Sequence, residues 1–309
     1  MKRFLKRLFI YIGILLVFNI VISNIIKNIN PSPTYKQFYK LSHLDVVFTG
    51  SSHSAFSINP FIIDSIVGVK TFNLSSPAQS PKTAYFVVNE IIKEKHPDLI
   101  VQELFFYTFY PQNQFLNQML PISEFKHLDS QLFIDHFSYI ELTKMAFPFY
   151  YQKKNIKNFF KTLPYKSEDN KEDVYYHKGY YGFNNRVSKK ELEDAIVDYK
   201  SFDRKLLKKP TEQIEYLIKT IDLCRKNNVK LIWYTAPLPK AIIDKMETYK
   251  EFSFNIDSIA SANSLKYIDL NNFNELFSDS LHFKDSDHLN YNGGLILSDF
   301  MANEILKNE

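Results

Sequence analysis

Two short segments near opposite ends of the chain carry the residue types of a nucleophilic site. Near the start, Thr49–Ser54 has the sequence T-G-S-S-H-S and follows a short apolar run. A serine at such a strand-to-helix turn presents its Oγ to a substrate, while nearby backbone N–H groups stabilise a developing oxyanion. The same residues also suit a helix N-cap or an anion-binding loop, so this segment alone leaves both readings open.

The second segment directly precedes the last helical stretch. Phe283–Gly294 has the sequence F-K-D-S-D-H-L-N-Y-N-G-G, with Asp285 three residues before His288. One turn of chain lets the Asp285 carboxylate hold the imidazole in the tautomer that accepts a serine proton. Ser52, Asp285 and His288 therefore make a candidate triad, although the G-x-S-x-G elbow of ordinary α/β-hydrolases is absent.

Three neighbouring residues have weaker claims to a catalytic role. His53 directly follows the candidate nucleophile and would point away from its Oγ in most turn geometries, so we expect a structural or substrate-contacting role. Asp287 adjoins His288, and adjacent side chains rarely face one another, so Asp285 is favoured as the orienting carboxylate. His43 is the third such residue, and we do not assign it a catalytic role.

A metal site is an alternative for the second segment. His282, Asp285, Asp287 and His288 lie within seven residues and are ligand types for Zn²⁺ or Mn²⁺. No helical H-x-x-x-H pair or second ligand cluster accompanies them. Cys224 is the only cysteine, which excludes an intramolecular disulfide and a cysteine-based metal site. The sequence predicts neither a bound metal nor a cofactor.

Short apolar runs alternate with helical stretches and supply the elements that must position these residues. The candidate strands are 45–49, 70–74, 98–104, 229–235 and 266–270. The helical faces between and after them are Ala84/Val87/Val88/Ile91, Ile214/Leu217/Ile218/Ile221/Cys224 and Leu297/Phe300/Met301/Ile305. This alternation predicts an α/β fold with a mostly parallel, helix-covered sheet. Ligands bind such sheets beyond the carboxyl ends of the strands, here at 50–54, 75–80 and 235–239.

The pattern breaks between about residues 105 and 204, where aromatic clusters such as F-F-Y-T-F-Y and F-P-F-Y-Y replace it. We expect an insertion packed over the carboxyl edge of the sheet. Its aromatic faces would stack on sugar rings or line an acyl pocket, or simply form the core of the insertion.

The N-terminus has the pattern of a membrane anchor. Leu8–Ile26 contains no charged residue and would span roughly 28 Å as a helix, which matches a bilayer core. Four basic residues precede it and only Lys27 follows, so the positive-inside rule places Met1 in the cytoplasm and the rest of the chain outside. A cleaved signal peptide is the main alternative, but no A-x-A-like site follows. A buried helix of a soluble domain is a weaker one.

The remaining composition narrows the class of partner. Four of the 38 Lys and Arg residues belong to the N-terminal cluster, and the other 34 balance the 34 Asp and Glu. No basic stripe is present, so nucleic acid is not an expected partner.

We expect a cytoplasmic tip and transmembrane signal anchor at 1–27, a linker at 28–40 containing Pro31 and Pro33, and one extracytoplasmic domain at 41–309, periplasmic or on the cell surface.

Four motifs together resemble the SGNH/GDSL hydrolase superfamily. They are the strand-G-S-S start, N-L-S-S-P-A-Q-S at 73–80, I-W-Y-T-A-P-L-P at 232–239 and the terminal D-x-x-H-L-N-x-x-G. The likeness covers about residues 45–104 and 205–306, and it is closest to the membrane-anchored branch that includes the D-alanyl-lipoteichoic-acid and alginate O-acetylation proteins. It implies a three-layer, flavodoxin-like sandwich with Ser52 as nucleophile and Asp285 and His288 as its partners.

Two positions depart from the family pattern at the expected oxyanion hole. Ser75 stands where a glycine usually offers its N–H, and a backbone N–H survives that change. The third block usually supplies an asparagine, whereas this chain has Glu103 near that place, and a carboxylate would repel an oxyanion. Gln79 or Gln102 are the candidate substitutes.

The resemblance implies a serine esterase or O-acyltransferase that acts through an acyl-serine intermediate. The predicted anchor makes a cell-envelope polysaccharide or another acyl ester the expected substrate, and a membrane-bound O-acyltransferase the expected source of the acyl group. The alternative is a non-catalytic SGNH-like subunit that binds glycan or acts as a scaffold in a polysaccharide acylation complex.

Overall fold

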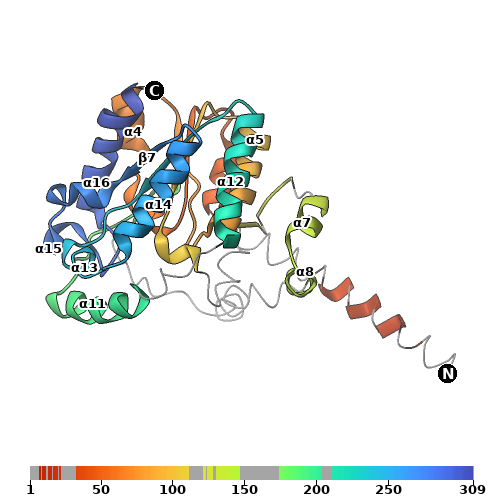
Figure 1. Cartoon of the computed structure of the whole chain (residues 1–309). Coiled ribbons are helices and arrows are strands. Elements are labelled where there is room, and N and C mark those ends of the chain that lie inside the picture. Colours follow the sequence, from red (N-terminus) through yellow and green to blue (C-terminus); the bar gives the residue numbers. More distant parts are fainter. Residues whose placement is uncertain are drawn as a thin grey trace, which may run out of the picture.

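Five parallel strands form a sheet at the centre of the protein (Figure 1). The computed structural model describes residues 33–110, 121–122, 124–127, 130–146, 174–203 and 211–308, with scattered positions between 7 and 21. The strands lie in the order β2-β1-β3-β6-β7, with the bounds Thr71–Asn73, Val46–Thr49, Leu99–Glu103, Lys230–Thr235 and Lys266–Asp269 respectively. Their register pairs Phe48 with Asn73 and Val101, and Val101 with Ile232, so their carboxyl ends meet at one edge.

Helices cover both faces of this sheet (Figure 1). Helices with buried residues packed against one face are α2 (Pro33–Lys40), α5 (Pro81–Lys95), α12 (Thr211–Lys226) and α14 (Tyr249–Ala262). The opposite face is covered chiefly by α4 (Pro60–Val67) and α16 (Tyr291–Phe300). Strand residues alternate accordingly, since Val47 and Trp233 belong to the first core and Phe48 and Tyr234 to the second. The predicted α/β arrangement is confirmed for the described residues.

The predicted linker at 28–40 is wrong for its second half. Pro33 begins the helix α2, and Tyr35 and Phe38 of that helix are buried in the core. Proline is tolerated in the first turn of a helix because its missing N–H would have no partner there. Residues 28–32 lie outside the described part of the chain.

Part of the predicted membrane anchor, including residues 22–26, lies outside the described residues. Within Leu8–Ile26, only separate positions between 9 and 21 are described, and these are helical. Among the described residues, no helix combines the length and apolar character needed to cross a bilayer.

The described parts of the predicted insertion are the turn η1 (Phe106–Phe109), the helices α7 (Ser130–His136), α8 (Tyr139–Ala146) and α11 (Lys189–Asp203), and the hairpin of β4 (Val174–His177) and β5 (Tyr180–Phe183). The hairpin turn contacts the end of β2, where Asn73 N donates to Lys178 O at 3.0 Å. Gly179 has a φ of +85°, and a Cβ there would lie 1.7 Å from Asn73 O. Only glycine therefore allows this approach.

Between α12 and the C-terminus, short elements connect the last strands. They are α13 (Lys240–Ile243), the turn η2 (Leu270–Leu276) and α15 (Asp279–His282). The loop from Phe283 to Asn290 then leads into α16. Asn290 caps that helix, because its Oδ1 accepts from Gly293 N at 3.1 Å while its Nδ2 donates to Leu281 O at 2.8 Å. These two hydrogen bonds of the Asn290 side chain tie the end of the loop to α16 and to α15.

Candidate active site

Ser52 stands at the first position of α3 (Ser52–Ser57), immediately beyond the carboxyl end of β1. The chain turns at Gly50, whose φ of +146° is accessible to glycine, and a Cβ there would lie 2.6 Å from Glu103 Cβ. Ser51 is the N-cap and accepts from His53 N at 3.2 Å. This turn leaves Ser52 partly exposed, with its Oγ 2.7 Å from His288 Nε2.

Asp285 holds His288 both through the backbone and through the ring. Its Oδ1 accepts from Asp287 N at 3.1 Å and from His288 N at 2.8 Å, which closes a turn around the carboxylate. Its two oxygens also lie 3.0 and 3.1 Å from His288 Nδ1. The structure thus brings Ser52, His288 and Asp285 into one hydrogen-bonded chain, the arrangement in which a histidine accepts a serine proton.

The electrostatic environment favours a charged His288. Burial alone would lower the pKa of this imidazole, but the adjacent Asp285 and Asp287 carboxylates outweigh burial and raise it to about 9. Burial would raise the pKa of Asp285, but its contacts with His288 and Lys284 hold it well below its ordinary value. The imidazolium that forms during proton transfer is therefore strongly stabilised.

The expectation that Asp287 faces away from His288 is wrong. Its Oδ1 lies 2.9 Å from His288 Nδ1, and its Oδ2 accepts from Tyr199 OH at 2.9 Å. The turn around Asp285 reverses the chain, which brings two adjacent side chains to the same side. Nothing in the sequence pointed to Tyr199, which belongs to α11 of the insertion.

His53 lies beside the site rather than in the proton path. His53 is only 3% exposed, and its ring stacks on His288 with centroids 4.6 Å apart. The ring also lies tilted against Phe105, with centroids 3.8 Å apart. Burial, followed by the nearby His288 charge, lowers the pKa of His53 to about 3. The uncharged His53 ring thus packs beside the site without taking part in proton transfer. His43, which pairs with Asp45 at 2.8 Å, lies at the opposite end of β1.

The three predicted oxyanion or substrate contacts occupy different environments. Ser75 N donates to Asn73 Oδ1 at 3.2 Å, and its buried Oγ has no partner within the described residues. Gln79 joins the second rim loop to β1, since its Oε1 accepts from Thr49 at 2.7 Å and its Nε2 donates to Ser76 at 3.1 Å. Gln102 is 1% exposed within β3, with no partner for its amide among the described residues. Their role at an oxyanion stays a prediction.

Glu103 supports the nucleophile turn from within the sheet. It is 3% exposed, and its Oε2 accepts from Ser51 N at 2.7 Å. Burial raises the pKa of Glu103 to about 7, although hydrogen bonds from Ser51 oppose this shift. The expected repulsion of an oxyanion is therefore weakened, because a carboxyl with this pKa is partly neutral near pH 7. Sequence reasoning located this residue but missed its contact with Ser51.

Two aromatic rings, one from α3 and one from the insertion, lie beside the triad. Phe56 of α3 lies 5.0 Å from the His288 ring and 5.0 Å from Phe183 of β5, measured between centroids. Lys284 Nζ is 4.9 and 4.7 Å from the centroids of Phe56 and Phe183, and 2.7 Å from Asp285 Oδ2. Cation–π contacts of this kind hold an amine beside rings. Phe183 thus places the predicted insertion at the site itself.

The residues that could bind a metal in the structure differ from those that the sequence suggested. Within the described residues, the atoms of His53, Asp287 and His288 that could bind a metal lie within 4.8 Å of one another. His282 does not join them, because its Nδ1 accepts from Ser278 N at 2.9 Å. Both ring nitrogens of His288 already contact Ser52, Asp285 or Asp287. These contacts favour the triad over a metal centre.

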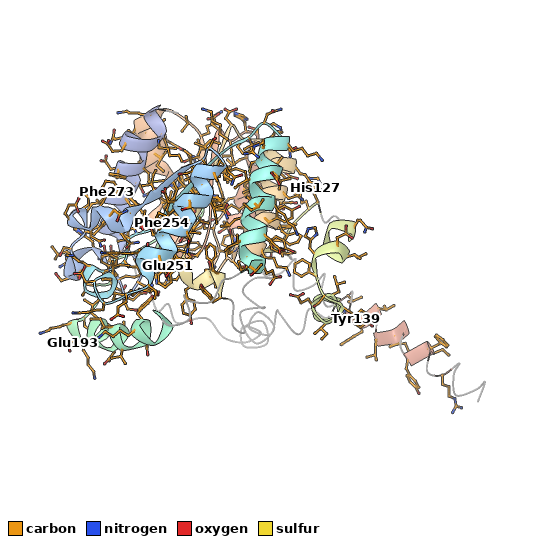
Figure 2. The ribbon with its side chains drawn as sticks, in the orientation of Figure 1. His127, Tyr139, Glu193, Glu251, Phe254 and Phe273 are labelled. Carbon is orange, nitrogen blue, oxygen red and sulfur yellow. The ribbon has the colours of Figure 1, made fainter. Side chains whose placement is uncertain are left out.

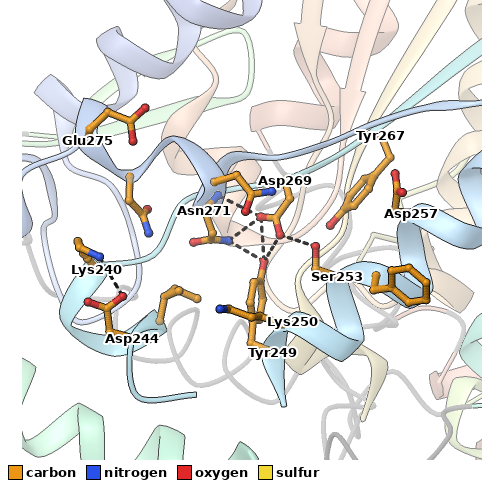
Figure 3. A pocket seen from close by; sticks show the side chains of 14 residues that line it. Lys240, Asp244, Tyr249, Lys250, Ser253, Asp257, Tyr267, Asp269, Asn271 and Glu275 are labelled. Atoms are coloured by element: carbon orange, nitrogen blue, oxygen red, sulfur yellow. Dashed lines mark hydrogen bonds and ion pairs between the residues drawn. The ribbon is translucent and has the colours of Figure 1, made fainter. Parts of the chain in front are cut away.

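A large cavity lies beside β7, the far edge strand from β2, and includes no triad residue. It has a volume of about 680 Å³ and is lined by α13, α14, β7 and η2 (Figure 3). Its floor is a closed network in which Asp269 accepts from Tyr249, Ser253 and Asn271. Phe254, 68% exposed, projects from α14 at its margin (Figure 2). Because the Asp269 carboxylate is satisfied, we interpret this network as structural.

Comparisons with known proteins give weak matches. A protein-family model that names no activity matches residues 165–309, slightly less than half of the chain. No curated protein matches the sequence. Two solved structures are similar to this chain. One is a candidate acylhydrolase from Bacteroides fragilis, with 13% identity, a TM-score of 0.44, and a match that covers 90% of this chain and 97% of that chain. The other is a GDSL-like lipase from Bacteroides thetaiotaomicron, with 11% identity, a TM-score of 0.40, and a match that covers 89% of this chain and 98% of that chain.

Proposed function

We propose that this chain is an SGNH-type serine esterase or O-acyltransferase that works through an acyl-Ser52 intermediate. The observation that carries the proposal is the hydrogen-bonded chain from Ser52 Oγ to His288 Nε2, at 2.7 Å, and from His288 Nδ1 to Asp285, at 3.0 Å. Two segments more than 200 residues apart in the sequence have to fold together to make it. A serine, an imidazole and a carboxylate in this order form the standard device for activating a hydroxyl as a nucleophile.

The reaction follows from these contacts. Ser52 Oγ forms a bond to the carbonyl carbon of an acyl ester as its proton passes to His288 Nε2. The bond from that carbon to the alkoxy oxygen then breaks, and His288 returns the proton to the departing oxygen. Water or a sugar hydroxyl next attacks the carbonyl carbon of the acyl-serine and gives its proton to His288. The bond from that carbon to Ser52 Oγ then breaks, His288 returns the proton to Oγ, and the acyl group leaves as an acid or a new ester. Asp285 stabilises the imidazolium throughout.

The oxyanion formed in each step needs hydrogen-bond donors. Ser52 N–H lies in the first turn of α3, where backbone N–H groups have no acceptor within the helix. We assign this N–H as one donor. The backbone N–H of Ser75, at the neighbouring strand end, is the candidate for the second, and it would have to leave Asn73 Oδ1, to which it donates at 3.2 Å. Glu103 fixes the turn that presents the first of these through its bond to Ser51 N.

The substrate and location rest on the N-terminal segment. The uncharged run Leu8–Ile26 behind a basic cluster supports a membrane-anchored chain with its main domain outside the cytoplasm. A cell-envelope polysaccharide is then the accessible acyl acceptor or ester substrate. A membrane-bound O-acyltransferase is the partner that would supply acyl groups for transfer. This location also supports the finer assignment to the membrane-anchored branch.

One observation favours a second function. Glu103 occupies the place where an oxyanion-binding asparagine is expected, and it is a buried carboxyl. A chain with an intact triad but a weak oxyanion hole would suit a non-catalytic, glycan-binding or scaffold subunit of an acylation complex.

Hydrolysis of p-nitrophenyl acetate by the purified full-length chain separates the two functions. We expect release of p-nitrophenol by the wild type and a loss of at least about 100-fold in kcat/KM for Ser52→Ala, since removing a nucleophile leaves only residual catalysis. Ser65→Ala, which changes an exposed serine on α4, is the matched control and should keep wild-type activity. Equal rates for Ser52→Ala and the wild type would favour the non-catalytic subunit.

A further inference from the structure

His288 has two carboxylate neighbours at the same ring nitrogen. Asp285 lies 3.0 Å from Nδ1 and Asp287 lies 2.9 Å from it. A catalytic triad needs only one of them to fix the tautomer. The second carboxylate thus requires its own explanation.

A residue of the insertion holds Asp287 in place. Tyr199 of α11 donates to Asp287 Oδ2 at 2.9 Å, so that Oδ1 remains directed at His288. Burial raises the pKa of Tyr199 well above its ordinary value, and its hydroxyl remains a donor at the pH where the protein works. The Tyr199 ring packs edge-on against Phe106, with centroids 6.1 Å apart. The hydroxyl is therefore supported on a packed ring.

The other side of Asp287 faces a neutral group. His53 Nε2 lies 3.8 Å from Asp287 Oδ2, and its ring stacks on His288. This nitrogen is buried and has no hydrogen-bond partner within the described residues. Because burial keeps His53 uncharged, it does not compete with His288 for the negative charge of Asp287.

The remaining charges around His288 come from two further elements. Lys284 precedes Asp285 and pairs with its Oδ2 at 2.7 Å, which draws part of that carboxylate's charge away from the imidazole. Glu103 of β3 acts on His288 at longer range. Asp287, which has a hydroxyl rather than an ammonium group as its second partner, keeps more of its charge available to His288.

We propose that Asp287, held by the Tyr199 hydroxyl, is a second positioning residue for His288, so that the insertion completes the catalytic site. The proposal rests on the proposed function, in which His288 is the base for Ser52. Two carboxylates then share the imidazolium charge that forms at each proton transfer, and α11 fixes the direction of one of them.

Two measurements on the full-length protein test this role. One is the NMR titration of the His288 imidazole, assigned with a His288→Asn variant. The other is the pH profile of kcat/KM for p-nitrophenyl acetate. In Asp287→Asn we expect the titration and the acidic limb of the profile to move to lower pH by about one unit, because the imidazolium loses a carboxylate partner, and the plateau to fall roughly ten-fold. A purely structural role would not move the acidic limb.

Tyr199→Phe removes only the hydroxyl and keeps the ring packed on Phe106, so it tests the support of Asp287 without a large effect on folding. We expect shifts in the same direction, smaller than in Asp287→Asn. Asp198→Asn, at the exposed neighbour of Tyr199 on α11, is the control for charge removal and should match the wild type. Asp285→Asn should produce the largest loss.

An unchanged titration and an unchanged acidic limb in Asp287→Asn, together with a clear effect of Asp285→Asn, would overturn the proposal while leaving the esterase function standing. If instead Ser52→Ala hydrolyses the ester as fast as the wild type, the esterase function fails. The NMR titration would still decide in that case whether Asp287 and Tyr199 set the basicity of His288.

Discussion

The charge state of His288 decides how the candidate site works. Its Nε2 lies 2.7 Å from Ser52 Oγ, and only the neutral imidazole can accept the serine proton there. Its two carboxylate neighbours stabilise the protonated form and raise the pKa of His288 to about 9, against the opposing effect of burial. The same groups that prepare the site for proton transfer therefore keep the resting base protonated at neutral pH.

The pH profile of ester hydrolysis should show this directly. We expect kcat/KM for p-nitrophenyl acetate to rise from pH 7 to beyond pH 9 and to reach half of its plateau at about pH 9, because the raised pKa must be passed before most of His288 is neutral. Stopped-flow rates over this range, corrected for spontaneous hydrolysis, check it. Half of the plateau already reached near pH 6.5, at the ordinary pKa of histidine, would contradict the charge state described here.

At the scale of residues, the sequence indicated which residues are spaced to pair, but not in which direction their side chains point. Asp285 and His288 could be paired because three residues span one turn, and Ser52 because it follows a strand. Asp287 was set aside on the assumption that adjacent side chains diverge. The hydrogen bond from Asp287 N to Asp285 Oδ1 makes the turn that defeats this assumption. The signal available in the sequence was Asp285 itself, because aspartate is one of the residue types that close such a turn.

At the scale of elements, the turn from β1 to α3 depends on a buried carboxyl. Glu103 lies beside β1 in the sheet, close to Gly50, and accepts from Ser51 N. Only a residue without a Cβ fits at position 50, because the space is filled by Glu103. The strand pair β1–β3 thus shapes the turn that presents Ser52.

Glu103 should make the stability of the fold depend on pH. Burial raises its pKa to about 7 in the folded chain from an ordinary value near 4.5, so the unfolded chain loses this proton first as pH rises. The contribution to stability is highest below pH 4.5 and falls until about pH 7, by up to about 3 kcal/mol.

Chemical denaturation at pH 4.5 and pH 8 measures that difference. In Glu103→Gln, which keeps an acceptor for Ser51 N, we expect the fall in the free energy of unfolding between these pH values to be smaller than in the wild type by about 3 kcal/mol. Glu215→Gln, at an exposed position on α12, serves as the control and should behave like the wild type. An equal fall in Glu103→Gln and wild type would show that Glu103 is ionised throughout.

At the scale of the whole molecule, the sheet was predictable and the insertion was not. Apolar runs such as 98–104 and 229–235 became adjacent parallel strands because residues buried on both faces have few other ways to pack. Pro33 was misread because its effect depends on whether it begins a helix or interrupts one. The contacts of Tyr199 with Asp287 and of Phe183 with Phe56 depend on how the insertion docks, which no local pattern encodes.

The predicted anchor is testable on intact cells. We expect the full-length chain to remain in the membrane fraction after carbonate washing, because Leu8–Ile26 is long enough and apolar enough to span a bilayer. Leu15→Arg should reduce this fraction, since a central arginine costs roughly 2.5–3.5 kcal/mol on insertion, whereas Leu15→Ile should not. Wild-type protein found entirely in the wash, or resistant to protease added outside the cytoplasmic membrane, would contradict the anchor or its orientation.

The central claim is that Ser52 is a nucleophile activated by His288, and covalent labelling tests it most directly. The full-length chain is treated with a fluorophosphonate at pH 9 and the labelled peptide is mapped by mass spectrometry. We predict a single adduct on Ser52, absent in Ser52→Ala and formed at least about 100-fold more slowly in His288→Asn, which lacks the base. No adduct on Ser52 in the folded wild type, or equal labelling rates in His288→Asn, would contradict the account.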